Sequence, residues 1–247
     1  MQWKDQGIII ALKRLGEDKI IVTLLTHTHG RHMGVTRLNK KAEQVFHLGN
    51  LCDISWQARL PEHMGTWRLE NIHSAFAMIF QNPLQLEALN TACALIDATL
   101  PEREPHEEIF NVFQKFLYNL THENWSWFLI DLELILLKYA GISLDFSTCA
   151  ATGSKQDLIF ISPRTGRAVS KIAGSPYQDR LLKLPPCLTE SKRHEISLSS
   201  KEFLAVLELN EYFLNRYLFG LHGLKLPEAR ERFKNRLARQ SYKLRSE

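Results

Sequence analysis

The feature that most constrains the fold of this chain is a change of hydrophobic period near residue 80. Before it, apolar and polar residues alternate, most clearly over residues 52–60, as in a strand with one buried and one exposed face. After it, apolar residues recur three and four positions apart, as they do over residues 109–120, which is typical of an amphipathic helix. The chain is therefore expected to form a β domain followed by a helical domain.

Five short strands are expected in the first 75 residues, at 8–12, 20–24, 31–38, 52–60 and 66–73. Turns are expected at residues 16–18 and 29–31, where Gly and polar residues separate the apolar runs. Strands that follow one another without intervening helices are typical of a small closed barrel such as the OB-fold. Residues 1–78 are accordingly predicted to form an OB-fold β-barrel.

Helices are expected at 82–99, 105–120, 124–140, 199–217 and 227–238. Asn82 before Pro83, and Ser199 three residues before Glu202, are helix-capping patterns. Residues 141–195 are broken up by Gly and Pro and contain one expected strand, at 157–161. The predicted fold class is α+β: the N-terminal barrel, then a mostly α-helical C-terminal domain at 79–247 that contains an irregular segment at about 141–195.

Composition and charge point to a globular protein with a polyanionic partner. Hydrophobic residues make up 45% of the 247 residues and charged residues 23%, which is the ordinary globular range. Residues 1–80 hold 10 Lys and Arg against 7 Asp and Glu, and residues 190–247 hold 12 against 8. Residues 81–189 hold 9 against 12. The two ends are basic and the middle is acidic, so a polyanion is expected to bind at one or both ends.

The N-terminal residues do not have the layout of a secretory signal. The most apolar later stretch, residues 127–137, contains Asp131 and Glu133 and is shorter than a membrane span. A cytoplasmic, nucleoid-associated protein with no membrane contact is therefore expected. The four cysteines are widely separated and form no C-x-x-C pair, so each is expected to be reduced and buried.

Residues 27–41 carry the strongest local signal, with three His and four Lys or Arg, and with no acidic residue before Glu43. A basic strand–turn–strand segment of this kind attracts phosphates, because binding releases counterions condensed on the nucleic acid. The expected DNA-binding residues are Lys13, Arg14, Arg31, Arg37, Lys40, Lys41 and Arg59. Two alternatives remain open: a solvated basic sheet edge, and a surface that binds an acidic protein tail instead of DNA.

The same segment permits a metal interpretation, because His27, His29 and His32 are imidazole ligands of the kind that zinc uses. A turn is expected between His29 and His32, and no carboxylate lies close in sequence. Surface histidines are therefore favoured, and no metal site is predicted.

Three further features have both a functional and a structural interpretation. Trp3, Phe46, Trp56 and Trp67 could stack on bases, but the alternation around Trp56 favours the core. Residues 162–170 resemble a phosphate-binding loop in composition, yet they lack P-loop spacing and favour a turn with two exposed arginines. In the C-terminal segment, a basic stripe could bind DNA or an acidic tail, or could simply be solvated.

Enzyme motifs are absent from the sequence. It contains no G-x-S-x-G, no G-x-x-x-x-G-K-[ST], no G-x-G-x-x-G and no H-E-x-x-H. No catalytic residue and no cofactor are predicted, and a protein that is not an enzyme is expected.

Several segments together resemble the RecO family of recombination mediators. They lie at residues 7–10, 16–17, 24–31, 131–145, 149–153, 157–170 and 226–233, and so span nearly the whole chain. The resemblance implies an N-terminal OB domain that binds single- and double-stranded DNA and anneals complementary strands. It also implies RecR as a partner in loading recombinase onto strands coated by single-strand-binding protein, whose C-terminal tail would dock on the helical domain.

The resemblance also bears on individual residues. The family's basic OB surface corresponds to Arg31, Arg37, Lys40 and Lys41, with further candidates before and after them. Many members bind zinc through four cysteines in the irregular segment. Here Cys149 is the one cysteine at such a position, so a zinc-finger-like segment without zinc ligands is expected.

Overall fold

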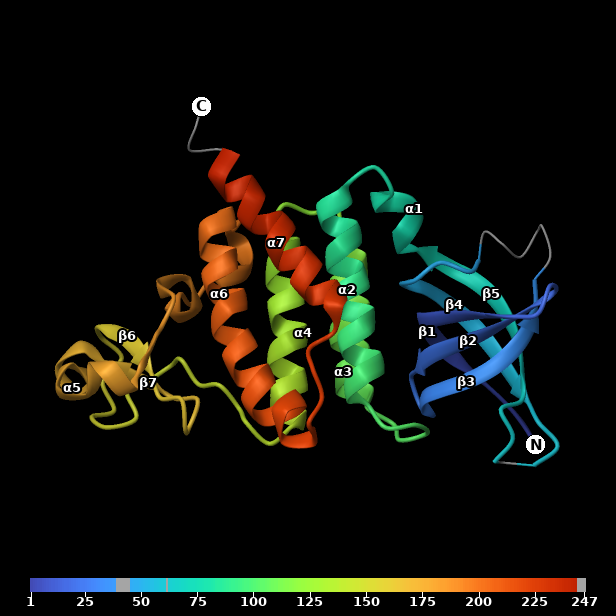
Figure 1. The fold of residues 1–247 in the computed structure, drawn as a ribbon, viewed down its shortest axis with the longest axis horizontal. Coiled ribbons are helices and arrows are strands. Elements are labelled where there is room, and N and C mark those ends of the chain that lie inside the picture. The colour runs from blue at the N-terminus through green and yellow to red at the C-terminus, as the bar shows by residue number, and fades with distance from the viewer. Residues whose placement is uncertain (39–44, 61, 244–247) are drawn as a thin grey trace. The chain divides into compact units, whose positions relative to one another are not determined.

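The computed structural model describes residues 1–38, 45–60 and 62–243, and they fall into two compact units (Figure 1). The first unit comprises Met1–His122 with Pro227–Phe233, and the second comprises Glu123–Leu226 with the residues from Lys234 onward. The sequence-based limit at residue 78 marks the change from strands to helices. The compact units separate later, after residue 122, because the three helices that follow the barrel group with it.

Five strands form a closed barrel in the order β1-β2-β3-β5-β4, as the OB-fold requires. They are β1 (Gln2–Leu15), β2 (Lys19–Thr26), β3 (Gly30–Arg37), β4 (Asn50–Gln57) and β5 (Thr66–Ser74). β1 is long enough to pair with β4 through its first half and with β2 through its second half. The barrel closes where Val35 of β3 pairs in parallel with Thr66 of β5. The predicted fold class is confirmed.

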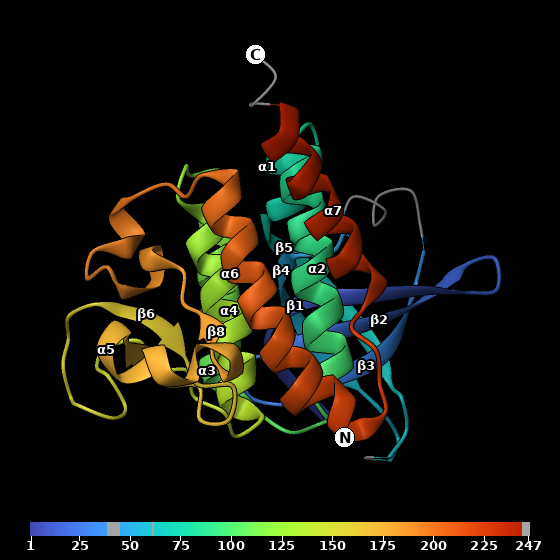
Figure 2. The same cartoon turned by 60° about the vertical axis from the view of Figure 1, so that its left-hand side comes forward.

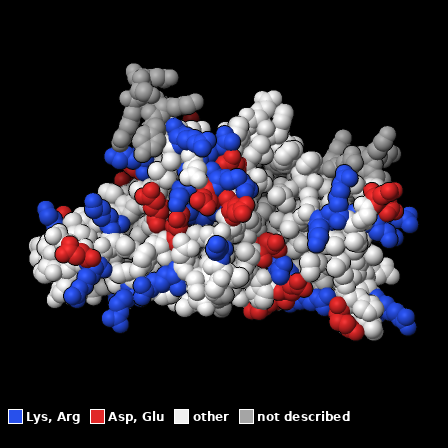
Figure 3. Space-filling view, in the orientation of Figure 1, with Lys and Arg blue, Asp and Glu red and all other residues white. Residues whose placement is uncertain are grey.

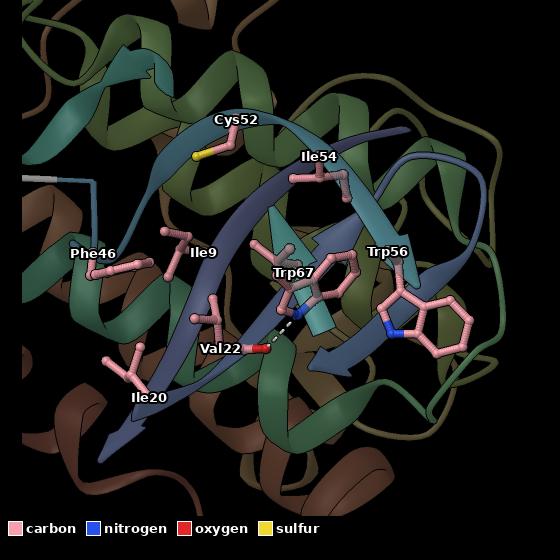
Figure 4. Close-up of a cluster of buried hydrophobic side chains, with 9 residues drawn as sticks. Ile9, Ile20, Val22, Phe46, Cys52, Ile54, Trp56 and Trp67 are labelled. Carbon is pink, nitrogen blue, oxygen red and sulfur yellow. Dashed lines mark hydrogen bonds between the residues drawn. The ribbon is translucent and has the colours of Figure 1, made fainter. Parts of the chain in front are cut away.

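The barrel core consists of the alternate, inward-facing residues of these strands (Figure 4). Trp56 and Trp67 are 1% and 3% exposed, which confirms the core interpretation of both rings. The Trp67 indole Nε1 donates to the Val22 carbonyl oxygen at 3.1 Å, so its polar atom is satisfied inside the core. Gly34 makes this packing possible, because a Cβ there would lie 2.6 Å from the Trp67 ring.

Three helices complete most of the first unit: α1 (Ala75–Ile79), α2 (Pro83–Thr99) and α3 (Glu107–Asn119). The Asn82 side chain accepts hydrogen bonds from the backbone of Leu84 and Gln85, which confirms the predicted cap of α2. α2 packs against β1, where the Cys93 thiol lies 3.8 Å from the Ile9 carbonyl oxygen. The apolar face of α3 is buried, as its helical spacing predicts.

The second unit is built on α4 (Trp125–Tyr139) and α6 (Ser200–Phe213), which pack against each other. Ser199 and Glu202 form the predicted capping box. The predicted helix to residue 217 is wrong in one respect, because α6 passes into a π-helix, η4 (Leu214–Phe219), followed by a 3-10 turn, η5 (Gly220–His222). The last helix, α7 (Glu228–Lys243), is longer than predicted and begins in the first unit.

The irregular segment contains a small sheet in the order β7-β6-β8 (Figure 2). Its elements are β6 (Leu158–Ile161), β7 (Ala168–Ser170), α5 (Lys171–Gly174), β8 (Leu182–Lys183) and the 3-10 helices η1 (Ser175–Arg180), η2 (Pro186–Thr189) and η3 (Arg193–Glu195). The prediction of one strand here was incomplete, because strands of two and three residues carry no readable period.

Hydrogen bonds hold the part of this segment where a zinc site would be sought. The Cys149 sulfur accepts a hydrogen bond from the Ser170 backbone at 3.2 Å, and the Asp145 backbone pairs with Gly166 and Ala168. No cluster of three or more His, Cys, Asp or Glu side chains able to hold a metal ion occurs among the described residues. Within the same residues, no helix is both long and apolar enough to cross a membrane.

Candidate nucleic-acid interface

An open groove of about 570 Å³ lies at one end of the barrel. It is lined by Leu15, Lys19, Val35, Thr36, Arg37, Gly65, Thr66 and Trp67. The closing contact between β3 and β5 brings the β4–β5 loop beside the end of β3, where the Val35 amide donates to the Gly65 carbonyl oxygen at 3.0 Å. The groove therefore lies between the β1–β2 and β4–β5 loops, which are the loops that bind oligonucleotides in OB-folds.

Two cations lie side by side in the lining of this groove. Lys19 of β2 and Arg37 of β3 are direct partners in the antiparallel register, and both are exposed. Neither forms an ion pair with another residue in the described ranges 1–38, 45–60 and 62–243. Like charges at directly opposed positions destabilise a sheet. A phosphate bound between these two side chains would remove that repulsion.

The β1–β2 hairpin places two of the predicted cations, Lys13 and Arg14, on different faces. Lys13 of β1 pairs with Ile21 of β2. Lys19 lies two residues before Ile21 on β2, so the side chains of Lys13 and Lys19 project from the same face. Arg14 pairs with Ile20, a core residue, and so projects from the opposite face of the hairpin. Lys13 thus extends the basic surface of the groove, whereas Arg14 lies behind it.

Arg31 has a different environment from the one expected. Its guanidinium donates to the Leu100 carbonyl oxygen at 2.8 Å and pairs with Asp97 at 2.9 Å and Glu102 at 3.5 Å. The side chain is only 17% exposed. Its charge is already neutralised by Asp97 in the last turn of α2 and by Glu102 after the helix, and its contacts connect the barrel to this part of the first unit. We therefore leave Arg31 out of the interface that we infer.

The remaining predicted cations belong to two loops. Arg59 is exposed in the β4–β5 loop, which ends at Gly65 in the groove. The Arg103 guanidinium donates to the carbonyl oxygens of Glu62 and His63 at 3.3 and 3.1 Å, so this loop is held in place by the residues after α2. Lys40 and Lys41 lie outside the described residues.

The three histidines of the metal interpretation have separate partners. The His27 ring lies 3.5 Å from Glu107, and His29 Nδ1 lies 3.1 Å from Asp5. His32 is 5% exposed, and burial lowers its pKa below the usual value, which favours the neutral ring. The pKa of Asp5 would be raised by burial, but hydrogen bonds from residues 28 and 29 hold it below its usual value.

Trp3 belongs to an aromatic cluster rather than to the groove. Its ring stacks on His29, with centroids 3.8 Å apart and planes at 4°, and it also contacts His32, Trp56 and Trp67. The rings cover one another's faces. Base stacking on Trp3 would therefore need His29 to move, and the groove is the better candidate for DNA.

Lys19 is the residue that sequence reasoning missed. It follows Glu17 and Asp18, two exposed carboxylates at the hairpin tip, and so does not stand out as part of a basic run. Its pairing with Arg37 becomes visible only when the register of the hairpin is known. In Figure 3, Lys and Arg side chains lie among Asp and Glu side chains over the barrel on the face shown.

Comparisons with known proteins agree with this architecture. Residues 1–75 match the family Recombination protein O N terminal, and residues 81–225 match Recombination protein O C terminal. Similar proteins include DNA repair protein RecO of Wolbachia pipientis wMel, 40% identical over 93% of this chain and 98% of that protein. Those of Rhodospirillum centenum and Cereibacter sphaeroides are 41% and 39% identical, over 96% and 97% of this chain and 94% and 99% of theirs.

Proposed function

The chain belongs to the RecO family of DNA repair proteins, and from that premise we propose that it binds DNA in the groove of its N-terminal barrel and anneals complementary strands. The bound groups would be the backbone phosphates. Lys19 and Arg37 would contact them directly, and Lys13 and Arg59 would extend the contact along the strand. Lys40 and Lys41 stay candidates on the basis of the sequence alone.

The opposed pair Lys19 and Arg37 is the observation that carries this proposal. Two cations in direct register, without an ion pair to any described residue, cost stability, and a polyanion in the groove offsets that cost. Phosphate contacts carry no sequence information, so binding would be independent of sequence and sensitive to salt.

Annealing follows from charge neutralisation without covalent chemistry. Two complementary strands repel each other through their phosphates, and bound cations reduce that repulsion when the strands meet. We therefore propose a mediator that is not an enzyme and needs no cofactor. Its site of action would be the DNA of the cytoplasm.

Two protein partners are part of the proposal. RecR would join the chain in loading recombinase, and the acidic C-terminal tail of single-strand-binding protein would bind the helical domain. Both follow from membership of the family. A pull-down of purified RecR and of the tail peptide with the intact chain would test each partner separately. A protein or peptide that does not bind would be excluded as a partner.

A double substitution tests the groove. We expect Lys19→Ala with Arg37→Ala to weaken binding of both single- and double-stranded oligonucleotides by about tenfold or more, since each lost phosphate contact removes a charge-assisted hydrogen bond. Fluorescence anisotropy at fixed salt measures the change.

The matched control removes two other barrel cations. Lys4 and Arg68 line a second surface pocket, in which Asp53 and Glu70 also lie, so their charges are locally compensated. Lys4→Ala with Arg68→Ala should leave DNA affinity within about twofold. Equal losses in the two double variants would mean that only net charge matters. If the groove variant instead kept its DNA affinity and lost binding to an acidic peptide, the surface would be a protein-docking site.

A further inference from the structure

The basic turn between β6 and β7, at residues 162–167, is a closed and well-defined element of the second unit. The Ser162 amide donates to the Arg167 carbonyl oxygen at 3.0 Å, and the Gly166 amide donates to the Ser162 carbonyl oxygen at 2.9 Å. Gly166 has a φ of +65°, which glycine adopts without strain. Arg164 and Arg167 project from this turn and are exposed.

The turn is joined to the π-helix η4. The Tyr217 hydroxyl donates toward the carbonyl oxygens of Pro163 and Arg164, at 2.9 and 3.0 Å. The π-helix ends where the Gly220 amide donates to the Asn215 carbonyl oxygen, five residues back. A Cβ at Gly220 would lie 2.3 Å from that oxygen, so the wide turn needs glycine there. π-Helical turns occur frequently at functional sites.

Arg216 is fixed between two tyrosines on this π-helix. Its guanidinium carbon lies 5.5 Å from the centroid of the Tyr217 ring, and its Nη1 donates to the Tyr212 hydroxyl at 3.0 Å. Arg216 is exposed, and the two rings are half-buried. Within the described part of the chain, neither Arg216 nor Arg164 forms an ion pair with a carboxylate, whereas Arg167 lies 3.8 Å from Asp145.

We propose that Arg164, Arg216, Tyr212 and Tyr217 form a second DNA-binding surface, separate from the barrel groove, that takes a single unpaired strand. The two arginines would contact phosphates, for which the planar guanidinium is well suited. The Tyr212 ring and the Arg216 plane would stack on bases, whereas Tyr217, whose ring stacks on Phe213 and lies under Arg216, would hold these groups in place.

The aromatic part of this surface selects the class of ligand. Positive charge alone would fit a duplex or an acidic peptide equally well. Bases in a duplex already stack on each other, so only an unpaired strand can place a base on Tyr212 or on the Arg216 plane. The choice of DNA rests on the proposed function, while the surface itself rests on the contacts described above.

A second surface would also suit annealing. A chain that holds one strand at the barrel and another on the π-helix would raise the local concentration of the second strand, without any further contact between the strands. Annealing would then depend on both surfaces, and binding of a single oligonucleotide would depend mainly on the stronger one.

The test removes Arg164 and Arg216, the two arginines of this surface, from the intact chain. We expect Arg164→Ala with Arg216→Ala to lower the affinity for a single-stranded oligonucleotide by about tenfold, to change duplex affinity by less than about threefold, and to slow annealing. The control is Lys155→Ala with Lys201→Ala, which removes the same charge from exposed positions of the same unit. The control should bind and anneal as the unsubstituted chain does.

The outcomes separate this inference from the proposed function. If the unsubstituted chain binds no DNA, both fail. If it binds DNA and the arginine variant binds and anneals as the control does, only the second surface is overturned. A variant that keeps its DNA affinity but loses binding to an acidic, apolar peptide would also overturn it, because the surface would then serve a protein tail.

A measurement on the unsubstituted chain avoids any question of folding. Single-stranded DNA that contains 5-iododeoxyuridine crosslinks under ultraviolet light to an aromatic ring stacked on the base. We expect peptide mapping to place a crosslink at Tyr212 with the single strand and not with the duplex. Crosslinks confined to the barrel would contradict the proposal.

Discussion

At the scale of single residues, burial decides how the histidines behave. His32 lies in the aromatic cluster with Trp3 and Trp56, and its Nδ1 donates to the Met33 carbonyl oxygen at 3.1 Å. Burial lowers its pKa, so the folded chain keeps the ring neutral where an unfolded chain would protonate it. These contacts make His32 a structural residue of the barrel.

A pH dependence of stability follows for His32. Because its folded pKa is below the unfolded value of about 6.5, the unfolded chain binds more protons between the two values, and stability falls as pH drops below about 6.5. We expect His32→Gln to lose less stability than the unsubstituted chain between pH 7.5 and pH 5.5. Urea unfolding at both pH values measures this. His73 and His106, whose pKa values are also lowered, remain in both proteins as a constant background. Identical losses would contradict the assignment.

At the scale of the element, Arg31 connects β3 to the last turn of α2 and to the residues that follow it. Arg31→Ala would leave Asp97 and Glu102 without their cation and the Leu100 carbonyl oxygen without its donor. We expect a loss of roughly 2 kcal/mol in the free energy of unfolding, since hydrogen bonds to charged groups contribute about 1.5–3 kcal/mol. Thermal and urea unfolding would measure the loss.

Arg59→Ala is the control for Arg31. Arg59 is exposed in the β4–β5 loop, so its removal should weaken DNA binding and leave stability unchanged. If Arg31→Ala instead kept its stability and lost DNA binding, Arg31 would be part of the DNA interface.

The elements that the sequence predicted are those with a long hydrophobic period or a specific cap. The alternation at residues 52–60 identified β4, and Asn82 and Ser199 marked the starts of α2 and α6. The short strands β7 and β8 left no such pattern. The π-helix η4 was also missed, because apolar spacing continues through it and its wider turn depends on a backbone bond to Asn215.

At the scale of the whole molecule, the candidate site could be predicted only in part. The sequence predicted the basic character of the N-terminal barrel, and Lys13, Arg37 and Arg59 are exposed as expected. The partners of Arg31 lie 66 to 71 residues further along the chain, beyond the reach of a local pattern. Lys19 required the register of β2 against β3. Local composition thus indicated which surface binds DNA. Which residues belong to that surface depends on contacts between residues far apart in the sequence.

The salt dependence of DNA binding measures how many phosphates the groove contacts. We expect log Kd for a single-stranded oligonucleotide to rise linearly with log salt concentration. For Lys19→Ala with Arg37→Ala, the slope should fall by about 1.4, since each phosphate contact contributes about 0.7 for single strands. A slope near zero for the unsubstituted chain, or an unchanged slope in this variant, would contradict a phosphate-binding groove at Lys19 and Arg37.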